Sequence, residues 1–183
     1  MRFRITASVL LIAIASILPI AAQQSNAQAP LRRPDVQWVP TPSAVVDAML
    51  KLADVKPTDV VYDLGCGDGV IVASAAQKYG ARAVGIDVDP ARVKEATERA
   101  QKMGVSDRVE IRQGDLFEAE IKDATVVTLY LLRSLNIKLM PKLKSELRPG
   151  TRIVSQTFDM GEAWPPEKTI EVEGRPVYLW TIK

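Results

Sequence analysis

The sequence predicts an α/β fold, with a doubly wound and mostly parallel sheet whose strands are separated by helices. Short apolar runs, which are typical of buried strands, alternate with stretches of helical periodicity between residues 41 and 183. A glycine-rich turn follows the first apolar run. The last two runs are separated by Glu173-Gly174-Arg175-Pro176, which predicts an antiparallel hairpin at the sheet edge.

Seven strands are expected from the apolar runs. They cover residues 60–64, 83–86, 109–112, 124–129, 151–155, 168–172 and 177–182. Helices between successive strands imply parallel pairing through right-handed crossovers. No internal repeat or linker divides residues 31–183, so one domain is expected.

Four helices are expected, over residues 41–53, 70–79, 89–104 and 135–147. Thr41 would cap the first helix, with Pro42 at its first helical position. Asp89-Pro90 would open the third helix in the same way. Pro141 lies inside the last pattern and should kink that helix or divide it in two.

Residues 1–29 have the layout of a secretory signal peptide. Arg2 and Arg4 precede an apolar run from Ile5 to Ala22, and Ala27-Gln28-Ala29 is a small-x-small cleavage pattern. The alternative is a membrane anchor over residues 5–22 that is not cleaved. The domain would then be periplasmic or secreted, or else tethered to the membrane. An extended arm over residues 30–40 would connect the leader to the domain.

The composition excludes several kinds of site. The chain of 183 residues has no histidine, so it can have no Ser-His-Asp triad, imidazole base or histidine-bound metal, and no metal site is expected. Its single cysteine, Cys66, allows no intramolecular disulfide. Lys and Arg number 24 and Asp and Glu 22, but two arginines belong to the leader, so 22 bases balance 22 acids beyond it. Nucleic acid is therefore not expected as a partner.

The turn Asp63-Leu64-Gly65-Cys66-Gly67-Asp68-Gly69 follows the first predicted strand. Glycines let the backbone bend sharply and approach a ligand closely, and in a doubly wound sheet this turn lies at the ligand crevice. The dinucleotide fingerprint G-x-G-x-x-G is the competing interpretation. Here the third glycine comes one position early, and Val70 stands at that fingerprint's last glycine. The pattern therefore favours a nucleoside ligand without a pyrophosphate.

Two further aspartates follow later strands. Asp87 ends the second predicted strand, where its carboxylate could accept both hydroxyls of a ribose, as in NAD enzymes. Asp115 follows the third strand in Gly114-Asp115-Leu116, where it could accept the exocyclic amine of an adenine that packs on Leu116. Each aspartate alone could be a helix cap or turn former. Three acids at three strand ends together indicate one binding site.

These acids and glycines, in this order, resemble those of the class I S-adenosylmethionine (SAM)-dependent methyltransferases, over about residues 36–183. The resemblance implies a Rossmann-like methyltransferase fold over residues 41–183, with seven strands, the last antiparallel, and SAM as the cofactor. It also implies a role for each cofactor-binding residue: Asp63 near the methionine part, Gly65, Gly67 and Gly69 along the cofactor, Asp87 at the ribose, and Asp115 with Leu116 at the adenine.

A narrower resemblance rests on Trp38-Val39-Pro40-Thr41-Pro42, the glycine turn, the region from Tyr130 to Leu147, and Val154-Ser155-Gln156-Thr157-Phe158 before Trp164. These segments are similar to the membrane-associated protein lysine methyltransferases of mitochondria, which modify the ATP synthase c subunit or the adenine nucleotide translocator. This resemblance implies a lysine amine of a membrane-associated protein as the methyl acceptor. It also implies that Trp38 and Trp164 flank the acceptor mouth.

Two functions from different classes remain open at this point. The first is a SAM-dependent methyltransferase, for which Tyr130, just past the fourth strand, is the candidate catalytic group. The second is an exported, non-catalytic module that keeps the fold and binds a nucleoside or a protein. The three aspartates favour the first. The leader favours the second because SAM is made in the cytoplasm, as does Gln156, which stands where the resemblance implies a histidine.

Overall fold

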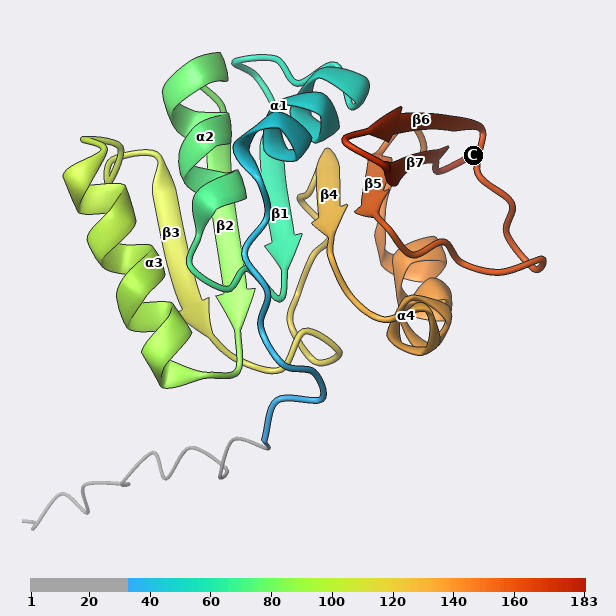
Figure 1. Cartoon of the computed structure of the whole chain (residues 1–183), viewed down its shortest axis with the longest axis horizontal. Helices are drawn as coiled ribbons and strands as arrows, with labels where there is room; N and C mark the ends of the chain where they lie inside the picture. Colours follow the sequence, from blue (N-terminus) through green and yellow to red (C-terminus); the bar gives the residue numbers. More distant parts are fainter. Residues whose placement is uncertain (1–32) are drawn as a thin grey trace, which may run out of the picture.

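Seven strands form one sheet in the computed structural model, which describes residues 33–183 (Figure 1). The strands are β1 (Val60–Leu64), β2 (Arg82–Asp87), β3 (Val109–Gln113), β4 (Val126–Leu129), β5 (Arg152–Gln156), β6 (Lys168–Val172) and β7 (Arg175–Thr181). Their order is β3-β2-β1-β4-β5-β7-β6. The strands from β3 to β5 pair in parallel, and β7 pairs antiparallel with both β5 and β6. The predicted fold class is confirmed; the predicted leader lies outside the described residues.

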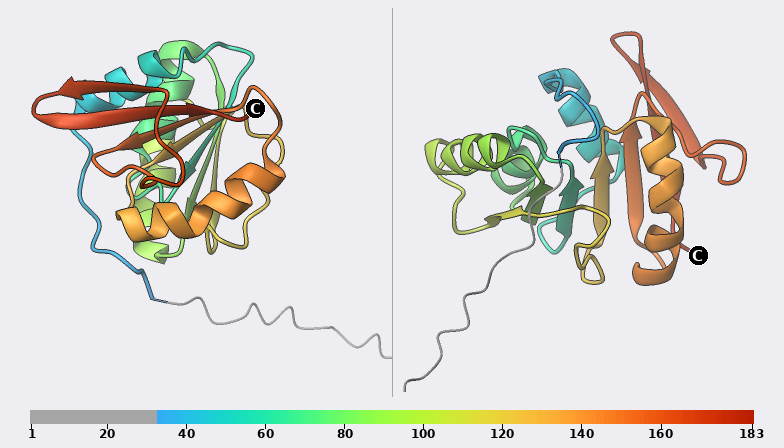
Figure 2. Two further views of the ribbon diagram at one scale, coloured as in Figure 1. Left: turned by 90° about the vertical axis from the view of Figure 1, so that its right-hand side faces the viewer. Right: turned by 90° about the horizontal axis from the view of Figure 1, so that it is seen from below.

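Helices cover both faces of the sheet. Helices α1 (Ser43–Leu52), α2 (Val70–Tyr79) and α3 (Pro90–Lys102) pack on one face, and α4 (Arg133–Glu146) packs on the other (Figure 2). None of the helices in residues 33–183 has both the length and the apolar character needed to cross a bilayer. The alternation of strand and helix thus produces the two covered faces that a parallel sheet requires.

The helix ends follow local chemistry, with two differences from the predictions. Asp89 caps α3 as expected, accepting a bond from the Ala91 N–H at 2.8 Å. Thr41 is not the cap of α1: Pro42 is extended and is itself the cap residue, and its carbonyl accepts from Val45 and Val46. Helix α4 is not divided but runs through Pro141 as one helix. The proline lacks an N–H for the carbonyl four residues earlier, and that turn is open to solvent, which can take the bond.

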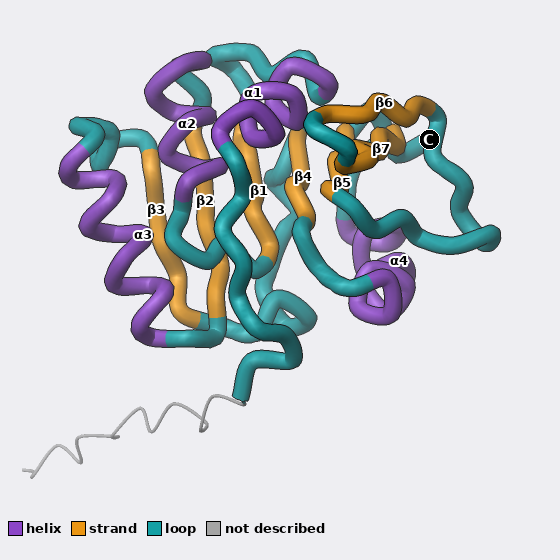
Figure 3. Tube along the Cα trace, viewed as in Figure 1, coloured by secondary structure: helices purple, strands orange, loops and turns teal. Residues whose placement is uncertain are grey.

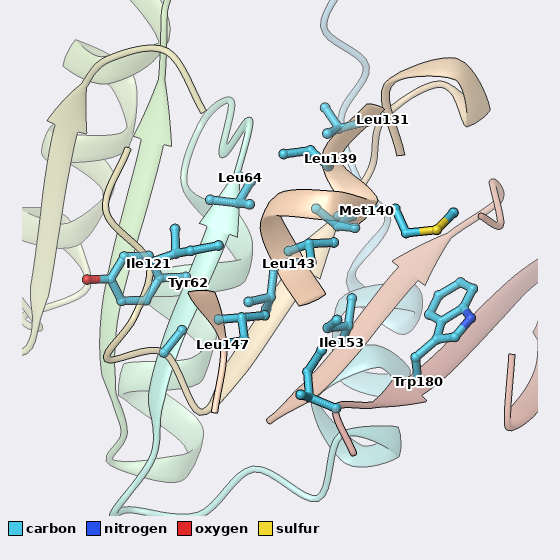
Figure 4. Close-up of a cluster of buried hydrophobic side chains, with 14 of the residues drawn as sticks. Tyr62, Leu64, Ile121, Leu131, Leu139, Met140, Leu143, Leu147, Ile153 and Trp180 are labelled. Atoms are coloured by element: carbon cyan, nitrogen blue, oxygen red, sulfur yellow. The ribbon is translucent and has the colours of Figure 1, made fainter. Parts of the chain in front are cut away.

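Apolar side chains of α4 hold it against the sheet. Leu139 and Leu143 have no exposed surface and join a cluster with side chains of β1, β5 and β7 (Figure 4). Trp180 of β7 closes this cluster on one side, where its Nε1 donates to the Trp164 carbonyl at 2.9 Å. Burying each large apolar side chain stabilises the fold by about 1.5–3 kcal/mol. The loop that leads from the carboxyl end of β4 into α4 is thereby fixed in place.

A buried ion pair joins β1, β4 and β5 at the opposite, amino end of the sheet. The Asp59 carboxylate pairs with the Arg152 guanidinium and accepts bonds from the Thr125 hydroxyl and the Lys56 N–H, both at 2.7 Å. Burial raises the pKa of Asp59, but the hydrogen bonds from Thr125, Lys56 and Arg152 outweigh it and hold the pKa below its ordinary value. The carboxylate therefore stabilises the folded chain in its ionised form.

Replacing this carboxylate tests the ion pair. We expect Asp59→Ala to lower the free energy of unfolding at neutral pH by about 2–4 kcal/mol, because it leaves the partly buried Arg152 guanidinium without its carboxylate partner. Since the folded pKa is depressed, the stabilisation is present above the ordinary pKa and is lost as the pH falls through the folded pKa. Urea unfolding at pH 7 and at low pH measures both effects. Asp47→Ala, which removes an exposed pair with Lys78, is the control and should change stability by about 0–1 kcal/mol. An Asp59→Ala deficit that is equal at both pH values would contradict this role.

Candidate active site

A cavity of about 490 Å³ opens at the carboxyl ends of the central strands. This volume lies in the ordinary range of small-molecule sites, which is about 300–1,000 Å³. The structure brings six of the eight residues predicted from the sequence into its wall: Asp63, Gly65, Asp87, Asp115, Leu116 and Tyr130. Gly67 and Gly69 are not among the residues that line it. Most of the predicted site residues therefore meet in one cavity at the carboxyl ends of the strands.

The glycine turn is fixed to the end of β2 by backbone hydrogen bonds. The N–H groups of Gly65 and Cys66 both donate to the Ile86 carbonyl, at 2.8 and 3.0 Å. The Gly67 N–H donates to Asp87 Oδ2 at 2.8 Å. Gly65, Gly67 and Gly69 have φ angles of 85°, 52° and 75°, in the left-handed region that favours glycine. The turn thus needs its glycines for its shape, apart from any ligand.

Two of these glycines make room for protein groups. A Cβ on Gly67 would overlap the indole of Trp38, which lies over the turn. A Cβ on Gly69 would lie 2.7 Å from Ala96 Cβ, so this glycine allows the start of α2 to pack closely on α3. Gly65 alone of the three lines the cavity. Their predicted role along the cofactor stays a prediction for Gly67 and Gly69.

The extended arm forms one wall of the cavity. Figure 3 shows this loop running past the carboxyl ends of β1 and β2 before it reaches α1. The Arg92 guanidinium of α3 lies 4.5 Å from the centre of the Trp38 ring, a cation–π contact that fixes the indole. Trp38 itself is 40% exposed and Val39 is 53% exposed, while Leu132 past β4 is 45% exposed. Apolar side chains therefore stand on both the arm side and the α4 side of the site.

Trp164, the second tryptophan predicted at the acceptor mouth, lies elsewhere. Its ring centre is 6.2 Å from that of Trp180, and it packs against the apolar cluster under α4. Lys144 lies 4.5 Å from the centre of its ring. Trp164 does not line the cavity, so the prediction is wrong for this residue. The loop between β5 and β6 is held on the core because the Trp164 carbonyl accepts a hydrogen bond from the Trp180 indole of β7.

The charge of the cavity wall is strongly acidic. Six aspartates and a single basic residue, Arg92, line it; the aspartates are Asp35, Asp63, Asp68, Asp87, Asp89 and Asp115. Such a wall favours a cationic ligand and opposes a phosphate. This charge pattern also argues against the dinucleotide interpretation, since no group of basic residues meets a pyrophosphate there.

Asp63 is the most perturbed of these acids. Its pKa is raised to about 7, mainly by burial and to a smaller extent by the charges of Asp87 and Asp68, although a hydrogen bond from the Thr128 hydroxyl lowers it. That bond, from Thr128 Oγ1 to Asp63 Oδ1, is 2.8 Å long and fixes the orientation of the Asp63 carboxylate on β1. A buried carboxylate with a raised pKa gains most from a cationic partner, because the partner favours the ionised form.

Sequence reasoning missed an ion pair that supports the turn. Arg99 of α3 donates through Nη2 to Asp68 Oδ2 at 2.5 Å and through Nε to the Asp68 carbonyl at 2.8 Å. The two residues are 31 positions apart, and nothing in the local pattern of either connects them. Asp35, on the arm, and Arg92 were missed in the same way. Only the packing of α3 and the arm against the turn reveals these neighbours.

The close contact at Gly69 can be tested by a pair of variants. Gly69→Ala and Gly80→Ala each place an alanine at a positive φ, of 75° and 70°, which costs about 1–2 kcal/mol. A methyl at Gly80 meets only Pro57 Cβ at 3.8 Å, whereas one at Gly69 overlaps Ala96. We expect Gly69→Ala to lose about 1–3 kcal/mol more in urea unfolding than Gly80→Ala, as overpacking costs that much. Equal losses would mean that α2 and α3 are not tightly packed at this point.

Comparison with known proteins agrees with this geometry. The ANTKMT methyltransferase domain family matches residues 63–168. A protein-lysine N-methyltransferase of Saccharolobus islandicus (strain REY15A) is 46% identical over 154 residues, which make up 81% of this chain and 95% of that protein. The adenine nucleotide translocase lysine N-methyltransferase of Mus musculus is 32% identical over 155 residues, or 85% of this chain and 66% of that protein.

A similar solved structure contains S-adenosyl-L-homocysteine, the product that SAM leaves after methyl transfer. The crystal structure described as an RNA methyltransferase from Salinibacter ruber in complex with S-adenosyl-L-homocysteine superposes with a TM-score of 0.77 at 61% identity, covering 79% of this chain and 94% of that one. A SAM-dependent methyltransferase from Geobacter sulfurreducens, in complex with the same product, has a TM-score of 0.57 at 28% identity over 63% of this chain and 48% of that one. The cofactor class that the sequence predicts is thus confirmed, and the chain belongs to the ANTKMT methyltransferase domain family of SAM-dependent methyltransferases.

Proposed function

We propose that this chain transfers the methyl group of SAM to the side-chain amine of lysine in a protein. The observation that carries the proposal is the acidic cavity, with six aspartates and one arginine in its wall. The SAM sulfonium, its ammonium group and the lysine side chain are all cations before reaction, so one acidic site attracts both substrates. The lysine methyltransferases to which the chain is similar support this choice of acceptor.

The residues in the wall suit SAM part by part. Asp63, buried and aimed by Thr128, would meet the ammonium of the methionine part. Asp87 Oδ2 accepts from Gly67 and Oδ1 from the Asp89 N–H, which leaves a further lone pair on each oxygen for a ribose hydroxyl. Asp115 and Leu116 would hold the adenine. These roles are part of the proposal.

SAM, when bound, supplies an activated methyl group, so the protein mainly binds, orients and excludes water. Lysine must react as the neutral amine. The acidic wall attracts the ammonium form, and removal of the amine from water then favours loss of its proton. Exposed Val39 and Leu132 provide apolar surface near the cavity for the lysine alkyl chain. Tyr130 lines the same cavity and contributes a phenolic hydroxyl to its wall.

RNA is the competing acceptor, because the Salinibacter ruber structure is described as an RNA methyltransferase. Beyond residue 29, acidic and basic residues are equal in number, and the cavity wall carries mainly aspartates. RNA binding depends on a surplus of basic groups that neutralise phosphates. A protein acceptor is therefore favoured. The non-catalytic alternative has no support in the relatives, which are methyltransferases.

The proposal includes a membrane-associated acceptor and export or tethering by residues 1–29. Arg33 begins the described chain, and the cavity-lining arm follows it directly. If residues 5–22 lie in a bilayer, a linker of about ten residues reaches at most ~35 Å before the arm begins. Such a tether would keep the cavity within reach of a membrane surface.

Transfer of a radiolabelled methyl group tests the proposed function. Purified full-length chain is incubated with methyl-labelled SAM and with separated membrane, soluble protein and RNA fractions. We expect label in protein of the membrane fraction, recovered after acid hydrolysis as methyllysine. Asp87→Ala, which removes the expected ribose partner, should lower the transfer by tenfold or more at limiting SAM, a loss of about 1.4 kcal/mol. Label found in RNA, or in no fraction, would contradict a protein lysine acceptor.

The raised pKa of Asp63 predicts a pH dependence of cofactor binding. With a pKa of about 7 in the free protein, the carboxylate is protonated at lower pH and must ionise to pair with the ligand ammonium. Affinity for S-adenosylhomocysteine should therefore rise with pH, by up to about tenfold per unit between pH 5.5 and 7, and then level off. Isothermal titration calorimetry across this range measures it. Asp63→Asn should bind weakly and with no such slope; a flat profile for the natural chain would rule out this pairing.

A further inference from the structure

The carboxyl end of β5 holds buried polar atoms without hydrogen-bond partners. In the described part of the chain, three such side-chain atoms occur: Gln156 Nε2, Gln156 Oε1 and Asn136 Oδ1. Gln156 has no exposed surface and is not among the residues that line the cavity. Buried carboxamides are almost always hydrogen-bonded, so an unpaired one needs an explanation, and a missing ligand is one. Both ends of the Gln156 carboxamide are unpaired, which sets it apart from Asn136, whose Nδ2 donates to three oxygens.

The strand register places Gln156 beside the reacting end of the cofactor site. Side chains alternate between the two faces along β5, and Gln156 lies opposite Val177 on the face that α1 and α2 cover. Asp63 and its partner Thr128 lie on the same face, in β1 and β4. Because Leu129 pairs with Ser155, the next residue, Tyr130, comes level with Gln156. One face of the sheet thus carries Asp63, Tyr130 and Gln156 near its carboxyl edge.

The backbone after Gln156 is strained and firmly held. Thr157 has a φ of 67°, in the left-handed region that a β-branched residue rarely adopts. Its N–H donates to the Pro176 carbonyl at 2.8 Å, and the Phe158 carbonyl accepts from the Ser155 hydroxyl at 2.6 Å. Phe158 is thereby turned into the cavity wall. Strain that persists at the edge of a binding cavity is typical of functional positions.

The acceptor must approach from the β4 and β5 side. The acids proposed for the cofactor stand at the ends of β1, β2 and β3, on one half of the sheet order. Asp63, which would hold the methionine part, lies at the border of that half. A cofactor held in this way would present its methyl group toward the ends of β4 and β5, where Tyr130 and Phe158 line the cavity.

We propose that the Gln156 carboxamide, which is level with Tyr130 in the strand register, binds the amine of the acceptor lysine; this rests on the proposed function. Entry of the lysine side chain between Tyr130 and Phe158, which line the cavity, opens the wall to Gln156, and Gln156 Oε1 then accepts one N–H of the neutral amine. The nitrogen lone pair then points to the methyl carbon. The N–C bond forms as the C–S bond breaks, the electron pair stays on sulfur, and the new ammonium loses its proton to solvent.

This role has a consequence for the number of methyl groups added. Lysine and monomethyllysine, as neutral amines, still carry an N–H that Gln156 can bind, but dimethyllysine carries none. Gln156 therefore assists the first two transfers and not the third. A residue that only supports the fold would slow all three alike.

Gln156→Leu tests the proposal in the full-length chain, with the membrane protein fraction and labelled SAM as the probe. We expect the initial rate of lysine methylation at saturating SAM to fall tenfold or more, and trimethyllysine to rise relative to mono- and dimethyllysine. The dissociation constant of S-adenosylhomocysteine should stay within twofold. The thermal midpoint should be unchanged or higher, since an unpaired buried amide is replaced by an apolar group. Gln156→Met, of similar length and unbranched, gives the same readouts if leucine disturbs the packing.

Thr151→Val is the matched control, at the other end of the same strand. Thr151 is buried directly before β5, and its hydroxyl donates to the Ala124 carbonyl at 3.2 Å. This variant should lower the thermal midpoint while the rate per folded molecule and the product ratio stay within twofold. Unchanged rate and product ratio in Gln156→Leu and Gln156→Met, or weaker cofactor binding in proportion to the lost rate, would overturn the proposal. A natural chain that methylates no lysine would instead overturn the proposed function itself.

Discussion

The hydrogen bond from the Gly67 N–H to the Asp87 carboxylate is the contact on which the site depends most. It joins the glycine turn after β1 to the Asp87 carboxylate at the end of β2. The turn and this acid, which lines the cavity, are thereby fixed relative to each other. Asp63 is buried close enough to Asp87 and Asp68 for their charges to raise its pKa. The fold therefore holds carboxylates close together in a partly buried site. A bound cation reduces the repulsion between them.

In the proposal, the carboxyl edge of the sheet is divided between two substrates. The acids at or near the ends of β1, β2 and β3 would bind SAM, and Tyr130 after β4 and Gln156 at the end of β5 would serve the acceptor amine. Helix α4 and the antiparallel β7 pack against the second half and fix the backbone after Gln156. The arm then covers the first half with Trp38, which Arg92 holds over the turn. Each half is thus rigid for a separate structural reason.

Local sequence signals predicted most of the fold and three of the six aspartates in the cavity wall. Apolar runs and cap residues marked the elements to within a few positions, because strand burial and helix capping depend on near neighbours. Asp63, Asp87 and Asp115 could be found because each lies at or near the carboxyl end of a strand, and parallel strands end at one edge. The Arg99–Asp68 pair, the indole over Gly67 and the displaced Trp164 could not, because they arise from contacts between distant segments. The unpaired state of Gln156 is likewise visible only after packing.

A crystal structure of the chain with S-adenosylhomocysteine tests the central claim most directly, since it shows the orientation of the ligand in the acidic cavity. The account predicts the amino group within hydrogen-bond distance of Asp63, the ribose hydroxyls on Asp87, the adenine against Leu116, and the sulfur directed toward Tyr130 and the end of β5. A ligand bound outside this cavity, or one whose sulfur faces β3 and away from β4, would contradict it.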